Sequence, residues 1–290
     1  MNFLTIILEG GLGNQLFQIF IVISLSLKYK IPFKFVYSDI LTIGINRPTY
    51  WNNFLKSLKI FTDTKLNINN YPILREPHFH YYKIELEQHI EFIKNNGLKL
   101  SGYFQSYKYF EEKYNSIKKL IKLDEQLINI KNKYSNYFKE NKITVSMHFR
   151  LGDYKNLQQY HPIMNYNYYK KSLDIIIKDI NINIINILYF CEKEDNQYVL
   201  DTFINPLKIL YNSNQINFIK VDDNIEDWEQ LLLMSNCHNN IIANSSFSWW
   251  GAYFNQNPNK IVCYPSVWFG NKLNTHNTKD LCPNNWIKID

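Results

Sequence analysis

The sequence predicts an α/β protein made of two Rossmann-like domains, each with a parallel sheet. Apolar, strand-like runs alternate with segments of helical periodicity, most regularly after residue 142, and this alternation is typical of a parallel sheet covered by helices. The chain also begins with a strand, a glycine-rich turn, a helix and a second strand, which is the order of a βαβ unit. Its 290 residues suffice for two ordinary domains, expected at 1–140 and 141–290 and facing a cleft.

Hydrophobic periodicity defines both ends of the first domain better than its middle. The expected strands are 3–8, 33–37 and 98–104, and the expected helices are 16–27, 110–121 and 127–138. Segment 40–97 has no clear period. It contains three histidines that lack a recognisable set of metal ligands and are interpreted as structural: His78, His80 and His89.

The second domain has a regular pattern from its start. Strands are expected at 143–149, 184–190, 215–221, 240–243 and 260–264, and helices at about 167–180, 194–204, 225–236 and 246–255. Ligands in folds of this kind bind at the carboxyl ends of the strands. Polar residues that directly follow a strand are therefore the first candidates for a functional site.

Composition and charge exclude several classes of protein. The net charge of +6 is spread along the chain, and no basic block resembles a nucleic-acid-binding arm. The four cysteines form no CxxC pair, which argues against a zinc site and favours a reducing compartment. No apolar segment has the features of a signal peptide or of a spanning helix. We therefore expect a cytoplasmic protein with at most peripheral membrane association.

The first candidate motif is GGLGNQ at 10–15, between a strand and a helix. Gly11 and Gly13 allow a backbone to approach a ligand closely, and Asn14 lies at the helix start, where exposed N–H groups favour an anion. A dinucleotide fingerprint would need a third glycine where Leu16 stands. Phosphate binding and a tight structural turn both remain open for this motif.

The second candidate motif is HFRLGDY at 148–154, which follows an expected strand. Arg150 offers a fixed fork of donors that matches a phosphate group, and His148 precedes it. Asp153 could orient Arg150 or accept a proton from a hydroxyl. The alternative is a structural Arg–Asp pair that closes a turn.

The third candidate motif is NSSFSWWGAYF at 244–254, where an expected strand leads into a helix. Ser245 and Ser246 could cap the helix or hold a phosphate at its N-terminus. Phe247 and the two tryptophans that follow could offer flat faces to a ligand. A well-capped core helix rich in aromatic residues is the alternative.

Two weaker signals are acidic residues after expected strands. Asp222 and Asp223 could bind a metal or a base edge, although a solvated loop explains them as well. Another strand is followed by Glu192, Glu194 and Asp195, and acidic residues commonly enrich the first turn of a helix.

The motifs together resemble the α-1,2-fucosyltransferases of glycosyltransferase family 11. The resemblance spans nearly the whole chain, in the order of that family, and is weakest at 40–97. It is carried by GGLGNQLFQI, GYFQSYKYF (102–110), HFRLGDY, LLMSNCHNNIIANSSFSWWGAYF (232–254) and PNNWIKI (283–289).

The resemblance implies a GT-B fold of two facing Rossmann-like domains and a metal-independent, cofactor-free transfer with inversion. GDP-β-L-fucose would be the donor, and the 2-hydroxyl of a terminal galactose on an oligosaccharide or glycolipid the acceptor. His148 and Arg150 would contact the diphosphate. The nucleotide phosphates would be lined by Ser245, Ser246 and Phe247, and the site would be closed from the other domain by Gly11, Gly13 and Asn14.

Two positions depart from the family pattern. The family usually has two adjacent arginines in its H-x-R-R-G-D motif, and Leu151 stands at the second of them. Glu229 and Gln230 occupy the neighbourhood where related enzymes often have the aspartate that would contact guanine. For the proton of the acceptor hydroxyl, Asp153 and Glu9 are both candidates.

Three alternative functions share parts of the pattern. A fucosyltransferase of another linkage would differ only in its product. A nicotinamide-dependent oxidoreductase would use the first βαβ unit. A catalytically weak sugar-binding protein would bind a glycan without turnover, and Leu151 is the residue that favours this alternative.

Overall fold

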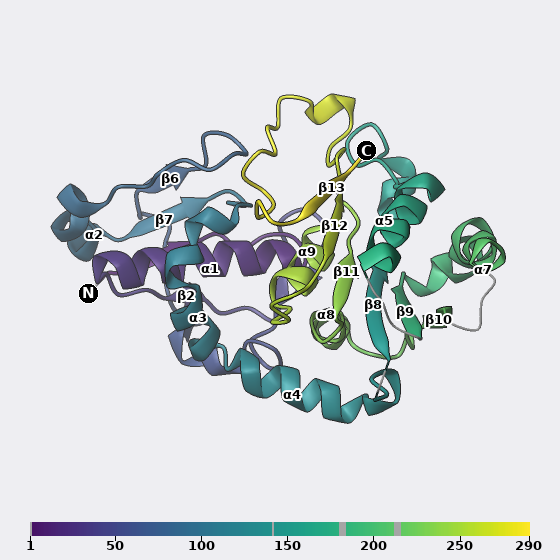
Figure 1. Ribbon diagram of the computed structural model, residues 1–290. Helices are drawn as coiled ribbons and strands as arrows, with labels where there is room; N and C mark the ends of the chain where they lie inside the picture. The colour runs from purple at the N-terminus through teal and green to yellow at the C-terminus, as the bar shows by residue number, and fades with distance from the viewer. Residues whose placement is uncertain (1, 141, 180–183, 212–215) are drawn as a thin grey trace. The chain divides into compact units, whose positions relative to one another are not determined.

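The computed structural model describes residues 2–140, 142–179, 184–211 and 216–290 (Figure 1). Three predictions reach residues outside these ranges: the expected second domain begins at 141, one expected helix ends at 180, and one expected strand begins at 215. Contacts divide the chain into two compact units. The first comprises Met1–Asp124 and His276–Pro283, and the second comprises Glu125–Thr275 and Asn284–Asp290.

The first unit contains a small parallel sheet beside a long buried helix. Its strand order is β1-β7-β6, with every neighbouring pair parallel. The sheet strands are β1 (Leu4–Ile6), β6 (Ile73–Arg75) and β7 (Leu98–Ser101). Two short pairs lie outside it: β2 (Phe35–Val36) with β5 (Thr62–Asp63), and β3 (Ile40–Leu41) with β4 (Arg47–Pro48). The helices are α1 (Leu12–Tyr29), α2 (Ile90–Asn96) and α3 (Tyr114–Leu120).

Helix α1 is buried along nearly its whole length, because apolar residues occupy almost every side of it. It ends at Tyr29, where Lys30 adopts a left-handed conformation (φ 54°) and its N–H bonds to the Ser26 carbonyl. Gln15 and Gln18 are buried within the first half of the helix. Their amides bond to the backbone of neighbouring loops and hold those loops against the helix.

The second unit is built on a six-stranded sheet with the order β10-β9-β8-β11-β12-β13, and all neighbouring strands are parallel. Numbered along the chain this order is 3-2-1-4-5-6, the usual Rossmann order, which reverses direction between β8 and β11. The strands are β8 (Ile143–His148), β9 (Ile185–Phe190), β10 (Ile216–Lys220), β11 (Asn239–Ile241), β12 (Val262–Pro265) and β13 (Ile287–Ile289). The helices are α4 (Leu123–Lys133), α5 (Tyr166–Asp179), α6 (Asn196–Val199), α7 (Asn205–Leu210), α8 (Asp227–Ser235) and α9 (Ser246–Tyr253).

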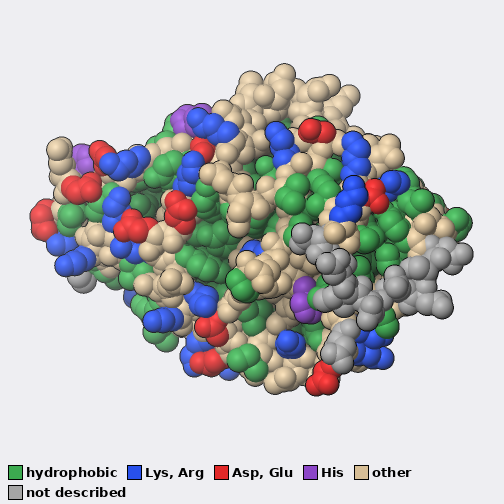
Figure 2. All heavy atoms as spheres, viewed as in Figure 1, with side chains coloured by type: hydrophobic (Ala, Val, Ile, Leu, Met, Phe, Trp, Pro, Cys, Tyr) green, Lys and Arg blue, Asp and Glu red, His purple; other side chains and the backbone are tan. Residues whose placement is uncertain are grey.

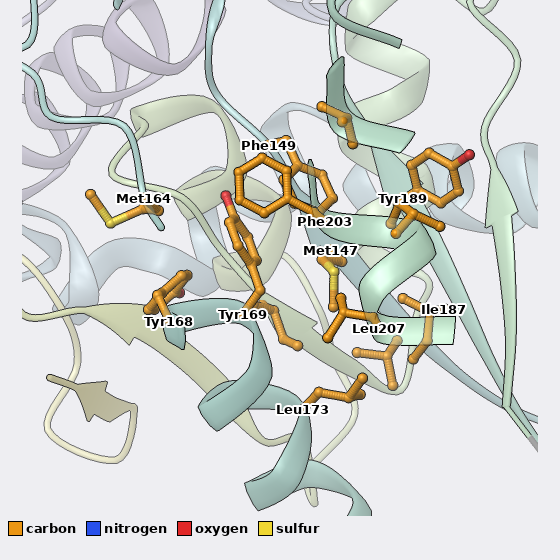
Figure 3. Packing of buried hydrophobic residues seen from close by; sticks show 14 of the residues in the cluster. Met147, Phe149, Met164, Tyr168, Tyr169, Leu173, Ile187, Tyr189, Phe203 and Leu207 are labelled. Atoms are coloured by element: carbon orange, nitrogen blue, oxygen red, sulfur yellow. The ribbon is translucent and has the colours of Figure 1, made fainter. Parts of the chain in front are cut away.

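An apolar cluster between this sheet and its helices forms the core of the second unit. Phe149, just past β8, belongs to this cluster, with its ring centroid 4.3 Å from that of Tyr169 and 5.0 Å from that of Phe203 (Figure 3). Leu207 from α7 and Met147 from β8 extend the cluster. This packing fixes the segment that leaves the carboxyl end of β8.

The predicted α/β class with parallel sheets is confirmed, and five strands of the second sheet match their expected positions to within two residues. Strands β1, β2 and β7 lie within the strands expected at 3–8, 33–37 and 98–104. The elements that were not predicted are α2, α7, β3, β4, β5, β6 and β13. The helix expected at 194–204 consists of α6 and a π-helical turn, Leu200–Ile204, that continues it.

The division between the units differs from the expected border at 140/141 because α4 packs with the second unit. Asn236 donates a hydrogen bond to the Leu127 carbonyl (3.1 Å), and Glu229 accepts hydrogen bonds from Lys133 (2.6 Å) and Tyr134 (2.7 Å). The chain also returns to the first unit near its end, where Lys108 pairs with Asp280 at 2.6 Å, a contact that joins residues far apart in sequence.

Basic and acidic side chains are interspersed on the face shown in Figure 2, in agreement with their even spread along the sequence. Within the described ranges, no helix combines the length and the apolar character that a membrane crossing requires.

Candidate functional site

Two of the predicted motifs meet at the reversal of strand order in the second unit. Strands β8 and β11 are neighbours, with Met147 in register with Ile241, so the segments that follow them leave the same edge of the sheet. The ring centroids of His148 and Phe247 lie 5.6 Å apart, and Tyr154 donates a hydrogen bond to the Asn244 carbonyl (3.3 Å). This position is where ligands bind in open parallel sheets.

His148 lies at the end of β8 and is only 8% exposed. Its backbone carbonyl accepts a hydrogen bond from the Tyr169 hydroxyl (3.1 Å), while its Nδ1 has no hydrogen-bond partner among the residues that the structure describes. Burial, and secondarily the Arg150 charge, lower the pKa of His148 to about 3. The imidazole is therefore neutral at pH 7 and can donate one hydrogen bond, but it carries no positive charge for a phosphate.

Arg150 is held by two carboxylates and an aromatic ring. Its Nη1 donates to Glu192 and its Nη2 donates to Asp153. The guanidinium carbon lies 5.0 Å from the centroid of the Tyr154 ring. The guanidinium is thus partly buried and oriented at the strand ends, and Glu192, whose role the sequence did not reveal, contributes from the end of β9.

The turn that contains Arg150 requires glycine two residues further along the chain, at position 152. Gly152 has φ +40°, and a Cβ atom there would stand 2.5 Å from a carboxylate oxygen of Glu192. Its N–H donates to Asp195, a buried carboxylate that also pairs with Lys155. Leu151 is 1% exposed and points into the apolar core with Phe149. The position of the usual second arginine is therefore a packing position in this chain.

The third motif builds the start of helix α9. Ser245 is its N-cap, and its hydroxyl accepts a hydrogen bond from the Phe247 N–H (3.3 Å). Ser246 is the first helical residue and is partly exposed, as is Phe247. Trp249 and Trp250 are fully buried, so the expectation that they offer flat faces to a ligand is wrong and their alternative role in the core holds.

Asn244, directly before this helix, is 1% exposed and has a fixed amide orientation. Both hydrogens of its Nδ2 are directed to backbone carbonyls, those of Pro162 (2.9 Å) and Trp268 (3.1 Å). Its Oδ1 has no partner within the described part of the chain. Nδ1 of His148 and Oδ1 of Asn244, at the ends of neighbouring strands, thus both lack a hydrogen-bond partner among the described residues, and an ordered water or a ligand would supply one.

The glycine motif forms the turn before α1 in the first unit. The demand for glycine falls on Gly10, which has φ +79° and where a Cβ atom would stand 2.5 Å from Nδ2 of Asn14. Gly11 is the N-cap in an extended conformation, and Gly13 lies buried within the first helical turn. Oδ1 of Asn14 accepts a hydrogen bond from Gln105 (2.9 Å). The donor-binding roles of Gly11, Gly13 and Asn14 stay predictions.

Two carboxylates stand at strand ends of the first unit. Glu9 follows β1, and burial raises its pKa. Glu76 follows β6, and burial raises its pKa to about 7. The sequence did not single out Glu76, because the short strands of 40–97 show no period that would mark a strand end.

The weaker acidic candidates have local partners. Asp223 accepts hydrogen bonds from Asn196 (2.6 Å) and Lys220 (2.7 Å), and Asp222 accepts one from the Asn224 N–H (2.9 Å). These contacts match the interpretation as a solvated loop. No group of three or more metal-ligating side chains occurs within the ranges that the structure describes.

The side chains at the position expected for guanine contact have local partners too. Glu229 is buried, accepts hydrogen bonds from Lys133 and Tyr134, and faces α4. The Gln230 amide donates to the Ile225 carbonyl (2.8 Å). Neither contact identifies the residue that would bind a base.

An arginine and a capped helix start at the switch point of a Rossmann sheet suit a phosphate-containing ligand. The model of "Glycosyl transferase family 11" matches residues 3–290, and the chain belongs to this family. The expected family is confirmed.

Two curated relatives from Escherichia coli match over nearly their full length. The O-antigen biosynthesis glycosyltransferase WbnK is 29% identical over 97% of this chain and 99% of its own length. An alpha-1,2-colitosyltransferase is 27% identical over 98% of this chain and 97% of its own. A solved structure of a mutant of Arabidopsis thaliana FUT1 in complex with GDP matches with a TM-score of 0.49 and 11% identity, over 90% of this chain and 70% of that chain.

Proposed function

We propose that this glycosyltransferase transfers L-fucose, with inversion, from GDP-β-L-fucose to the 2-hydroxyl of a terminal galactose on an oligosaccharide or glycolipid. The observation that carries the proposal is the convergence of Arg150, His148 and the Ser245–Ser246 helix start at the switch point, beside unsatisfied polar atoms. The name of one relative, alpha-1,2-colitosyltransferase, supports the linkage.

The residues at the switch point of the second unit suit a role in stabilising the leaving diphosphate. When fucose departs, negative charge grows on the β-phosphate, and preorganised donors lower the barrier by stabilising that charge. Arg150 would supply a bidentate fork once the diphosphate replaces one of its two carboxylate partners. The first N–H groups of α9 and the hydroxyls of Ser245 and Ser246 would hold phosphate oxygens.

The acceptor hydroxyl needs a group that takes its proton. Asp153 is already bonded to Arg150, which favours an orienting role for this carboxylate. Glu9 has a pKa raised by burial, which brings it nearer to the value of an effective base at neutral pH. Within the proposal, Glu9 is therefore the preferred proton acceptor, and neutral His148 serves as a hydrogen-bond donor to the diphosphate.

Binding of GDP tests the donor class independently of turnover. We expect GDP to raise the melting temperature, because a ligand at 100 times its Kd stabilises the folded state by about 2.7 kcal/mol. NAD at the same concentration is expected to leave it unchanged. Stabilisation by NAD and not by GDP would favour the oxidoreductase alternative, and stabilisation by neither would contradict the proposed donor.

Turnover is expected to persist in EDTA, because the proposal assigns the neutralisation of the diphosphate to Arg150 and to helix N–H groups. The measurement compares transfer rates after dialysis against EDTA with rates after Mg²⁺ or Mn²⁺ is added back. Loss of turnover in EDTA with recovery on Mg²⁺ would show that a divalent ion takes part. Asp222 and Asp223 would then be candidates for its ligands.

The donor sugar has a second candidate. The relative named alpha-1,2-colitosyltransferase is similar over nearly its whole length, and its name states a sugar other than fucose. Assays with GDP-fucose and GDP-colitose, each with the same galactoside acceptors, decide between the two. The proposal expects the higher kcat/KM with GDP-fucose, whereas a preference for GDP-colitose would replace the donor and leave the linkage to be tested.

A further inference from the structure

Glu76 is a partly buried carboxylate that the proposed mechanism does not use. It directly follows β6, so it stands at the carboxyl edge of the first unit's parallel sheet. Glu9, after β1, and the turn that begins at Gly102, after β7, leave the same edge. This is the edge at which ligands of parallel sheets are bound.

The Glu76 carboxylate holds a turn in an unusual backbone conformation. Its Oε2 accepts hydrogen bonds from two successive N–H groups, those of Tyr103 (2.8 Å) and Phe104 (3.0 Å). Gly102 has φ +142° and Phe104 has φ +53°, a value that is costly for a bulky residue. A Cβ atom at Gly102 would stand 2.6 Å from Oε2 of Glu76, so the backbone packs directly against the carboxylate.

The same turn connects to the glycine motif through two amide side chains. Gln105, the residue after Phe104, donates to Oδ1 of Asn14 (2.9 Å). Gln18 donates to the Gly102 carbonyl (3.1 Å) and accepts from the Glu9 N–H (3.1 Å). A displacement of this turn therefore reaches both Asn14 and Glu9.

The surroundings make the ionised form of Glu76 costly. Oε1 has no hydrogen-bond partner among the described residues. The pKa of Glu76 is raised to about 7, mainly by burial; the two N–H bonds and His78 act to lower it, and the Glu9 charge acts to raise it. The Glu76 charge in turn helps to raise the pKa of three neighbouring tyrosines: Tyr82, Tyr103 and Tyr109.

The sign of the resulting pH dependence argues against a purely stabilising role. Because the pKa of Glu76 in the folded state lies above its ordinary 4.5, the folded chain binds this proton more tightly than the unfolded chain does. The contribution of Glu76 to stability is therefore complete below about pH 4.5 and declines as the pH rises to about 7. A carboxylate that costs stability at working pH, and that fixes a strained turn, is typical of a functional position.

We propose that Glu76 is a positioning residue for the acceptor half of the reaction: its carboxylate holds the Gly102–Gln105 turn, and this turn sets the orientation of Asn14 and Glu9. The inference rests on the proposed function and names a residue that this function had not assigned. Protonation weakens the two N–H bonds, since hydrogen bonds to a charged acceptor are about twice as strong as neutral ones.

The test compares Glu76→Gln, which mimics the protonated form, with the wild-type protein and with Asp63→Asn. Asp63 is the control, because this carboxylate of the first unit is the last residue of strand β5 and also accepts a backbone N–H, that of Lys65 (2.8 Å). At pH 8, Glu76→Gln is expected to lower kcat by about 10- to 100-fold, the size of a small misplacement near reacting groups. At pH 8, the KM of Glu76→Gln for GDP-fucose is expected to be no higher than that of the wild-type protein, and its melting temperature no lower. Asp63→Asn is expected to keep wild-type kcat.

The pH profile separates positioning from packing. Wild-type kcat is expected to fall as the pH decreases through about 7, whereas the profile of Glu76→Gln is expected to be flat there. Wild-type kcat in Glu76→Gln, or a loss of kcat that retains the wild-type profile, would overturn the inference. A melting temperature lowered in proportion to kcat would overturn it as well.

An amide readout separates this inference from the proposed function. Hydrogen-exchange protection of the Tyr103 and Phe104 amides is expected to decrease below pH 7 in the wild-type protein and to be low at all pH values in Glu76→Gln. If the wild-type protein transfers no sugar to any acceptor, the proposed function fails, and the amide protection still decides whether Glu76 controls the turn. Equal protection in the two proteins across the pH range would contradict that control.

Discussion

Replacement of Arg150 by alanine is expected to lower turnover by at least about 100-fold, because the loss of one preorganised donor to a developing anion costs about 100- to 1000-fold in rate. Arg150 stands at the switch point of the second sheet, and two carboxylates and the Tyr154 ring fix its fork. The measurement is kcat with GDP-fucose at saturating acceptor. Arg150→Lys is expected to recover little, since an ammonium cannot reproduce a bidentate contact.

The matched control for this loss is Lys170→Ala in the same unit. Lys170 pairs with Asp174 at 2.8 Å on the surface of α5, a contact of the kind that contributes at most about 1 kcal/mol to stability. Its removal is expected to leave kcat unchanged. Turnover near that of the wild-type protein in Arg150→Ala would remove the assigned role of Arg150, even if GDP still bound.

Introduction of the family's usual second arginine by Leu151→Arg is expected to destabilise the protein by about 3–5 kcal/mol, the cost of an uncompensated buried charge. Leu151 is 1% exposed within the core cluster of the second unit, so an arginine there has no route to the site without a rearrangement of the turn. The measurement is the free energy of unfolding in urea, with near-ultraviolet circular dichroism as the probe of packing.

Leu151→Met is the control for this second prediction, because a volume-conserving exchange in a core costs less than about 1.5 kcal/mol. A Leu151→Arg protein as stable as the wild type, with tighter GDP binding, would show that the side chain reaches the ligand. In that case the packing role assigned to Leu151 would be wrong, and Leu151 would again favour the alternative of a catalytically weak sugar-binding protein.

The central strands of the second sheet could be predicted from the sequence because they are mainly apolar and buried on both faces. ITVSMHF and IINILYF are mainly apolar runs between clear helical periods, and they became β8 and β9. The same regularity placed Arg150 and Ser245 at strand ends. Their meeting then follows from the strand order, which puts β8 beside β11.

Contacts between distant residues and the directions of side chains could not be predicted. The sequence predicts for Glu192 only a place in the first turn of a helix. Its contact with Arg150 depends on the pairing of β8 with β9. Leu151 and Trp249 stand within site motifs but turn into the core, since their direction depends on local backbone angles. Glu76 follows a three-residue strand, which is too short to show alternation in the sequence.

The product linkage tests the central claim most directly. The protein is incubated with GDP-fucose and a panel of galactose-terminated oligosaccharides, and the purified product is analysed by two-dimensional NMR. The account predicts a single new α-anomeric fucose attached to the 2-hydroxyl of the terminal galactose, with GDP released in equal amount. Folded protein that binds GDP but transfers no sugar to any acceptor, or that attaches fucose at another position, would contradict it.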